Sequence, residues 1–327
     1  MYVPFTQTTV LSGVSEMLVS NHRLKGAVAI VIASLLWGTT GTAASYAPNI
    51  SPLAIGAFAM GFGGVLLCLV ARNSLLQDVK KLRSNPAAVI FGSLCVAIYP
   101  LAFYSSMRLS GVAIGTIVSI ASAPLFAVLL ERLFSKKAIS LQWCVSFLLG
   151  ASGIAMLAVG KTSTEAVQNN LAGQQLGVLL GLLAGLTYAG YSWAAKQLID
   201  KQVKSTSAMA CLFGCAAAVL LLSLFFTGGN LFASGINTSV VLYMAVIPMF
   251  LGYLLFGFGL KTTEASTATL ITLIEPLVAA LLAIYVLGEQ FKPIGWVGMV
   301  LVCLYLIVQT IKFKPERQGA ASLSAES

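Results

Sequence analysis

Charged residues are scarce in this sequence. Of its 327 residues, 9% are charged and 58% are hydrophobic, and the mean hydropathy is +0.93. Soluble domains carry about a quarter charged residues, so the composition excludes a soluble domain. Apolar runs long enough for a ~30 Å hydrocarbon core recur along the chain. The sequence therefore predicts an all-α polytopic membrane protein surrounded by lipid. Its formal charge of +9 reports loop lysines and arginines and does not indicate nucleic-acid binding.

Side chains for catalysis and metal binding are also scarce. His22 is the only histidine, which excludes Ser-His catalysis or a multi-histidine metal site within the bundle. The only aspartates, Asp78 and Asp200, are expected in loops, which excludes an Asp-rich metal cluster. No glycine-rich nucleotide loop with a lysine is present. We therefore expect neither an enzyme nor an ATP-driven pump, and no metal or cofactor.

The cysteines offer no metal site either. All six fall inside apolar runs, and their spacing matches no thiolate site. We expect free, buried thiols that pack as small apolar residues.

Ten apolar runs are visible, five on each side of one polar segment. A cytoplasmic extension (1–25) without a signal-peptide pattern, in which Met17 is a second possible start, precedes the first repeat (26–159). A periplasmic linker (160–175), a second repeat (176–311) and a polar cytoplasmic tail (312–327) complete the chain. The expected spans are 26–46, 53–71, 87–107, 113–133, 141–159, 176–198, 207–226, 239–260, 266–287 and 294–311.

The basic residues predict the orientation. With the N-terminus inside, sixteen of the 19 lysines and arginines lie in inner loops or tails. Only Arg108, Lys161 and Lys292 remain outside. Such a bias predicts cytoplasmic N- and C-termini. One missed or invented span would reverse half of the loops, so the bias also supports the count of ten.

The two halves resemble each other. Gly26 and Trp37 in the first half have the same spacing as Gly177 and Tyr188 in the second, and SIASAPLF (119–126) parallels ITLIEPLV (271–278). Because each half has an odd number of spans, the halves insert in opposite orientations. That plan is typical of secondary transporters, with the solute site near the midplane.

Glu275, followed by Pro276, lies in the middle of an apolar run. A charge at mid-bilayer costs roughly 2.5–3.5 kcal/mol, so such a residue usually faces a bundle interior or cavity. Proline removes a backbone donor, which leaves carbonyls free to face a solute. Two interpretations are open. Glu275 could be a protonated packing residue at a kink, or it could act in transport by exchanging protons or binding an ammonium group.

Several motifs together resemble the drug/metabolite transporter superfamily, of the EamA type. They are Leu36-Trp37-Gly38, Ala123-Pro124, Glu275-Pro276 and Leu287-Gly288-Glu289 before Trp296. The resemblance covers about residues 26–311. The first half departs from the pattern, because Phe134-Ser135-Lys136-Lys137 replaces the Gly-Glu loop and Ala123 stands in the place of Glu275.

The resemblance implies a central cavity lined mainly by spans one, three, four, six, eight and nine, with spans five and ten outside. Polar and aromatic residues on the lining spans suit a small amphipathic solute, although such residues also form interfacial belts and helix contacts. We expect Glu131 to pair with Arg132, and Arg108, Lys196 and Glu289 to serve helix ends or turns. The candidate substrate-binding residues are Trp37, Thr40, Tyr99, Tyr104, Ser122, Tyr188, Tyr191, Trp193, Tyr253 and Glu275, with Glu275 as the coupling candidate.

The resemblance also supplies the expected function. It implies a secondary transporter of the bacterial inner membrane that exports amino acids or related small metabolites by alternating access, with proton coupling left open. A lipid-carrier flippase of the same superfamily is the alternative. A channel is disfavoured, because the sequence shows no filter-like loop. Small-residue faces on the last helices permit a homodimer without requiring one.

Overall fold

The computed structural model describes residues 24–160, 171–288 and 290–310. The expected N-terminal extension, the C-terminal tail, the first part of the linker and Glu289 lie outside these residues.

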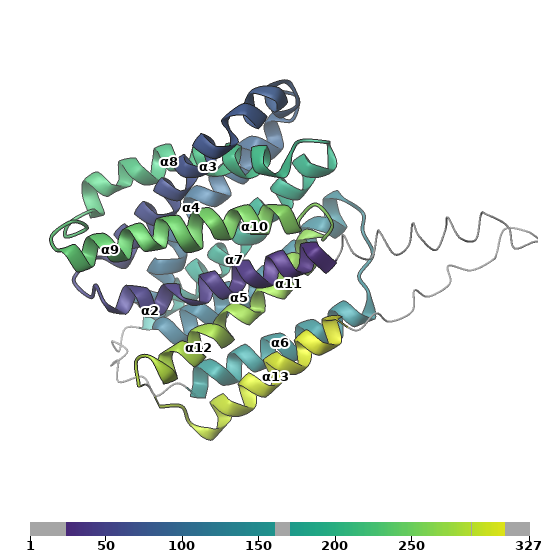
Figure 1. Cartoon of the computed structure of the whole chain (residues 1–327). Helices are drawn as coiled ribbons and strands as arrows, with labels where there is room; N and C mark the ends of the chain where they lie inside the picture. Colours follow the sequence, from purple (N-terminus) through teal and green to yellow (C-terminus); the bar gives the residue numbers. More distant parts are fainter. Residues whose placement is uncertain (1–23, 161–170, 289, 311–327) are drawn as a thin grey trace, which may run out of the picture.

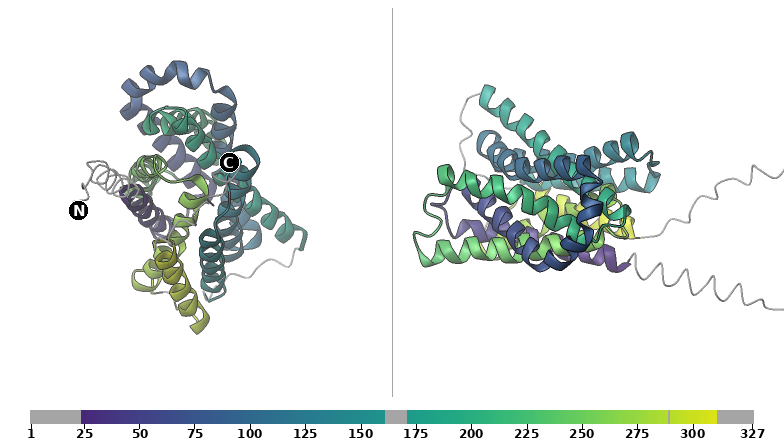
Figure 2. Two further views of the ribbon diagram at one scale, coloured as in Figure 1. Left: turned by 90° about the vertical axis from the view of Figure 1, so that its right-hand side faces the viewer. Right: turned by 90° about the horizontal axis from the view of Figure 1, so that it is seen from above.

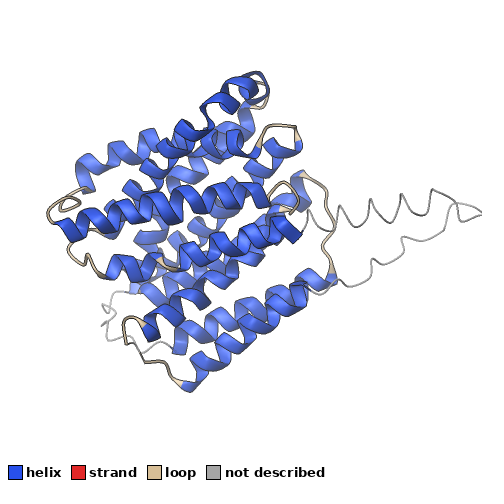
Figure 3. Ribbon diagram, viewed as in Figure 1, coloured by secondary structure: helices blue, strands red, loops and turns tan. Residues whose placement is uncertain are grey.

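The described residues form a bundle of long helices joined by short loops (Figures 1 and 3). Among the described residues, nine helices are long and apolar enough to cross a membrane, and a shorter apolar helix, α13, lies where the tenth span was expected. The predicted polytopic all-α fold is thereby confirmed. The first span is Leu24–Ser45, and its last turn is α2 (Thr40–Ser45). The others are α3 (Pro52–Arg83), α4 (Pro86–Ser110), α5 (Val112–Phe134), α6 (Leu141–Gly160), α7 (Leu171–Asp200), α8 (Ser205–Thr227), α9–η1–α10 (Gly235–Met244, Ala245–Leu251, Gly252–Gly259), α11–η2–α12 (Ala265–Ile271, Thr272–Ile274, Glu275–Tyr285) and α13 (Pro293–Thr310).

Two helices run beyond their apolar runs, which corrects the expectation that both aspartates lie in loops. Asp78 is buried within α3 and accepts a 2.9 Å hydrogen bond from the backbone N–H of Lys204, the residue before α8. Asp200 is the last residue of α7 and forms a 2.9 Å ion pair with Lys196. Each aspartate thus serves a helix end near basic residues.

The two five-helix repeats are inverted. At the start of the first span, a Cβ on Gly26 would lie 2.1 Å from Thr262 Oγ1. At the start of α7, a Cβ on Gly177 would lie 2.8 Å from Ser110 Cβ. Gly26 corresponds to Gly177 in the repeat, and Ser110 corresponds to Thr262. The same contact therefore occurs twice, once at each end of the bundle, as inversion requires.

Glycines allow equivalent helices of the two repeats to approach closely. Gly153 of α6 meets Gly298 of α13, because a Cβ on Gly298 would lie 2.6 Å from the Gly153 carbonyl oxygen. Gly64 of α3 lies equally close to the backbone of Phe213 in α8. Such small-residue contacts are typical of membrane helices. The glycine face of α13 is thus occupied within one chain, and a homodimer stays a prediction.

The thiols only partly match the expectation. The six cysteines are free and Cys95 is buried, but Cys215 and Cys303 are exposed on the outside of the bundle.

The fourth and ninth spans diverge along the bundle. Figure 2 shows the bundle from two further directions. The first half of the ninth span, α11, packs against α5. Its second half, α12, packs instead against α6 and α2. We name the end that holds the α2–α3 loop and Val112 the open end, and the end that holds Phe134 and Ala265 the closed end.

Candidate functional site

The helix break before Glu275 has a local cause in the sequence. Pro276 has no N–H, so the chain tightens into a 3₁₀ turn at Thr272–Ile274 and restarts as an α-helix at Glu275. The tightened turn changes which carbonyls are free. Tyr305 of α13, fully buried, donates to the carbonyls of Leu270 (3.1 Å) and Ile271 (3.0 Å). The carbonyls of Leu270 and Ile271 are therefore occupied by the protein and do not face a solute.

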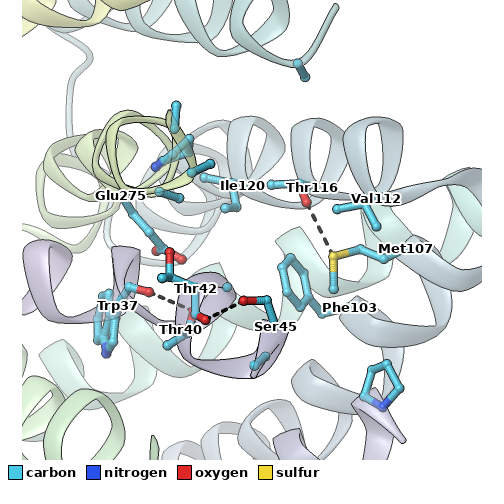
Figure 4. A pocket seen from close by; sticks show the side chains of 18 of the residues that line it. Trp37, Thr40, Thr42, Ser45, Phe103, Met107, Val112, Thr116, Ile120 and Glu275 are labelled. Atoms are coloured by element: carbon cyan, nitrogen blue, oxygen red, sulfur yellow. Dashed lines mark hydrogen bonds between the residues drawn. The ribbon is translucent and has the colours of Figure 1, made fainter. Parts of the chain in front are cut away.

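Glu275 lies at the first turn of α12, where the helix dipole favours a negative charge. Its side chain lines the central cavity (Figure 4). Within residues 24–160, 171–288 and 290–310, Glu275 has no hydrogen-bond or ion-pair partner. A carboxylate without a partner at this depth is costly, which makes Glu275 the most conspicuous polar group of the cavity.

The central cavity has a volume of about 500 Å³ and reaches from the open end to Glu275. Most of its wall is apolar, and its polar lining consists of a few hydroxyl groups and one carboxylate. The lining includes Trp37, Thr40, Thr42 and Ser45 of the first span, Phe103, Tyr104 and Met107 of α4, Val112, Thr116 and Ile120 of α5, Ile154 and Leu157 of α6, and Glu275, Ala279 and Ala283 of α12. Contrary to expectation, the fifth span thus forms part of the wall.

The first span is positioned by close contacts with α12 and η1. A Cβ on Gly38 would lie 2.6 Å from Val278 Cβ and 3.0 Å from the Glu275 carbonyl oxygen. The Trp37 indole donates a 2.8 Å hydrogen bond to the carbonyl of Pro248, within the π-helical turn η1. The Trp37-Gly38 pair therefore fixes the first span beside Glu275.

An aromatic cluster lies between the cavity and the closed end. The Tyr188 hydroxyl donates to Thr272 Oγ1 (2.8 Å), and the hydroxyls of Tyr191 and Tyr253 are 3.0 Å apart. The ring centroids of Tyr99 and Tyr188 are 5.6 Å apart. These rings enclose a space of only about 50 Å³ against Glu275. In this conformation they separate the cavity from the closed end.

The structure brings eight of the ten candidate residues together. They surround the small space beside Glu275: Trp37, Thr40, Tyr99, Tyr104, Tyr188, Tyr191, Tyr253 and Glu275 itself. Ser122 lies elsewhere, against Gly185 in the contact between α5 and α7. Trp193 lies near the closed end, where its indole donates to Ser135 Oγ (3.1 Å).

Other lining residues were not among the candidates. Phe103, Thr42, Ser45 and Thr116 line the cavity as well. Thr42 lies near a helix end, where a hydroxyl more often bonds its own backbone, so pattern alone could not single it out. The Phe103 side chain carries no polar atom, so nothing in the sequence distinguished it from other apolar residues of its helix.

The closed end is held by contacts between the repeats. The Glu131 carboxylate of α5 is 6% exposed and accepts from the backbone N–H (2.9 Å) and hydroxyl (2.5 Å) of Ser266 in α11. Lys137 forms an ion pair with Glu264, the residue before α11. The expected Glu131–Arg132 pair is wrong, since Arg132 is exposed and Glu131 caps a helix of the other repeat.

The basic residues Lys196 and Arg108, which were expected at helix ends, are not part of the cavity lining. Lys196 is buried but paired with Asp200. Arg108 is exposed at the end of α4 and is not part of the lining.

Comparisons with known proteins agree with this architecture. The chain matches the EamA-like transporter family twice, over residues 24–159 and 175–310. The uncharacterized transporter YwfM of Bacillus subtilis (strain 168) is 33% identical over 294 residues, which are 89% of this chain and 95% of that protein. The uncharacterized inner membrane transporter YedA of Escherichia coli (strain K12) is 26% identical over 196 residues, 59% of this chain and 60% of that protein.

A solved crystal structure shares the fold. It superposes with a TM-score of 0.73 at 18% sequence identity, covering 89% of this chain and 96% of the other. The sequence motifs, the paired five-helix repeats and the two family matches coincide. The chain is a multi-pass membrane protein and belongs to the EamA-like transporter family.

Proposed function

We propose that this protein is a secondary transporter that exports amino acids or related small metabolites across a bacterial inner membrane by alternating access. The observation that carries the proposal is a cavity that is open at one end and closed at the other by contacts between the repeats. Glu131 and Lys137 belong to the first repeat, and their partners Ser266 and Glu264 belong to the second. Rocking one repeat against the other would break these contacts and close the open end.

The basic residues support a direction for this structure. Lys136 and Lys137 lie at the closed end, on the side of the membrane that carries most of the lysines and arginines. If positive residues mark the cytoplasm, the termini are cytoplasmic and the cavity faces outward.

Glu275 is the proposed coupling site. Removal of a carboxyl from water disfavours its charged form, so a solute or a proton can compete for the same unpaired group. The family supplies the solute class of amino acids and related metabolites, and the cavity volume of about 500 Å³ suits a small molecule.

The test is radiolabelled counterflow in proteoliposomes preloaded with single amino acids or amines, with and without an imposed pH gradient. Saturable exchange of one solute class is expected. The binding site of a carrier faces each side of the membrane in turn, so it carries labelled solute inward and unlabelled solute outward. Asp200→Asn is a matched control that converts an acid to an amide outside the cavity. Flux through the protein without saturation or exchange would indicate a channel and contradict the proposal.

A lipid-carrier flippase is the second candidate, because the structure has a second groove on the side of the bundle. This groove lies between α2 and α9, has a volume of about 590 Å³, and shares Thr42 with the central cavity. A 2.7 Å hydrogen bond between Thr39 and Tyr243 crosses it. A flippase needs such a lateral groove. If no small solute exchanges, transbilayer movement of lipid-linked substrates is the assay that decides.

A further inference from the structure

The lining of the central cavity is chemically one-sided. Glu275 is its only ionisable acid, and none of the described residues that line it is lysine, arginine or histidine. Lys137 and Lys196 are paired with Glu264 and Asp200. Arg108 and Lys292 directly follow the lining residues Met107 and Phe291 in the sequence but are themselves outside the lining. A solute carboxylate would therefore find no positive side chain in the described lining of this cavity.

Three of the five hydroxyl side chains that line the cavity add to this bias, and Thr42 and Tyr104 carry the other two. Thr40 donates to the carbonyl of Trp37 (2.7 Å), Ser45 donates to the carbonyl of Thr42 (2.7 Å), and Thr116 donates to the sulfur of Met107 (3.4 Å). These three bonds appear as dashed lines in Figure 4. A hydroxyl has one proton, so each of these groups can only accept from a solute. Together with Glu275, these three hydroxyl groups favour a solute that donates hydrogen bonds.

The aromatic residues favour a cation as well. Trp37, Phe103 and Tyr104 line the cavity together with Glu275, and aromatic faces attract ammonium groups. The remaining wall is built from aliphatic side chains such as Ile117, Ile120 and Leu157. An apolar body beside the charged group would bury against these residues.

We propose that the central cavity selects small amphipathic monocations, namely amines with an aromatic or branched aliphatic body and no carboxylate, over zwitterions and anions. This inference rests on the proposed function and narrows its solute class from amino acids and related metabolites to their amine relatives. The ammonium group of the solute lies at the Glu275 carboxylate. No basic side chain of the described lining competes with it for that carboxylate. A carboxylate on the same solute would be buried without a partner, which is costly.

The experiment is equilibrium binding to the full-length protein in lipid nanodiscs, with two series of matched solutes. Phenethylamine, phenylalanine and 3-phenylpropanoate form one series, and isoamylamine, leucine and 4-methylpentanoate form the other. We expect the amine to bind at least about tenfold more tightly than its amino acid in one series or both, because a site with unpaired polar groups rejects mismatched analogues strongly. The acids should not compete.

Phenylalanine methyl ester separates charge from size. It is larger than phenylalanine but carries only the positive charge, so it should bind more tightly than phenylalanine by a similar factor. Glu275→Gln should abolish the preference for amines, whereas Asp200→Asn should preserve it.

Three results would overturn the inference. An amino acid that binds as tightly as its amine would show that the cavity has a carboxylate site, for example at the N-terminus of α5, where Val112 lines the wall. A Glu275→Gln variant with an unchanged preference for amines would show that another group binds the ammonium group of the solute. Absence of binding in both series would exclude the solute class. If amino acids nevertheless exchange in counterflow, the proposed transporter function stands while the inference fails.

Discussion

At the scale of single residues, Glu275 supplies the one carboxylate of the described cavity lining. Protonation would remove the only ionised group of its described lining, so binding of a cationic solute should weaken as the pH falls. In Glu275→Gln the carboxylate is absent at every pH, and we expect affinity at least about tenfold lower, as for loss of one partner of a buried charge pair, with no pH dependence. The measurement is the affinity of the wild type and of Glu275→Gln for the solute at pH values from about 5.5 to about 8.5.

Asp200→Asn should keep the wild-type affinity and pH profile, because Asp200 lies at the end of α7 and pairs with Lys196. A Glu275→Gln variant that retained both properties would exclude Glu275 as a binding and coupling group, and would favour the packing interpretation of this residue.

Gly38 offers a second prediction, on stability. A Cβ on Gly38 would lie 2.6 Å from Val278 Cβ, so Gly38→Ala should push the first span away from α12. Overpacking of this kind costs typically about 1–3 kcal/mol, and the thermal unfolding midpoint in detergent should fall accordingly. Gly41→Ala is the matched control, because a Cβ on Gly41 meets nothing within 4 Å. Equal midpoints for the two variants would show that the first span tolerates displacement.

Individual residues of the site were predictable where they broke a rule. Glu275 and Pro276 violate the apolar helix pattern, and Trp37 and Tyr188 combine an apolar body with a polar atom, so the sequence drew attention to them. Ser122 was a candidate for the same reason, but a small hydroxyl residue can equally fill a helix contact, as it does against Gly185. Only packing distinguishes these roles.

At the scale of elements, the Glu131–Ser266 contact joins α5 and α11 at the closed end. Because Glu131 accepts from the Ser266 backbone N–H (2.9 Å), Glu131→Ala should expose this amide. We expect faster hydrogen exchange at the start of α11, measured by mass spectrometry, without faster exchange between α3 and α8.

Glu264→Gln is the control for that variant. It removes the neighbouring ion pair with Lys137, whose two side chains are partly exposed, and such pairs are worth little, about 0–1 kcal/mol. If Glu264→Gln accelerates exchange as much as Glu131→Ala, the buried carboxylate has no special role in holding the closed end.

Element boundaries were harder to predict than element number. The helix break at Thr272–Ile274 was anticipated, because Pro276 cannot donate to the preceding turn. The π-helical turn Ala245–Leu251 was not, although Pro248 lies within it. The extension of α3 to Arg83 was also missed. Hydropathy marks where a helix leaves the apolar layer, whereas the helix itself can continue further, as α3 does to Arg83. Within this extension, Asp78 accepts from the backbone N–H of Lys204 at the start of α8.

At the scale of the whole molecule, the inverted repeats are not chemically equivalent. In the alignment of 119–126 with 271–278, Glu131 corresponds to Ala283 and Ser266 corresponds to Ile114. The closed end is therefore held by a carboxylate contact, whereas the equivalent residues at the open end are apolar. Ala283 lines the open cavity. This difference favours the conformation seen here when no solute is bound, and closure of the open end depends on filling the cavity.

Cross-linking tests this asymmetry in the full-length protein with its native cysteines replaced. The pair Ile114→Cys and Ala283→Cys reports on the open end, and the pair Lys137→Cys and Glu264→Cys reports on the closed end, where these side chains already touch. With a short bifunctional thiol reagent, the closed-end pair should react readily without solute. Transported solute should raise cross-linking at the open end and lower it at the closed end, because rocking one repeat against the other closes one end as it opens the other. Cross-linking of both pairs that solute leaves unchanged would contradict alternating access, and would mean that solute does not move one repeat against the other.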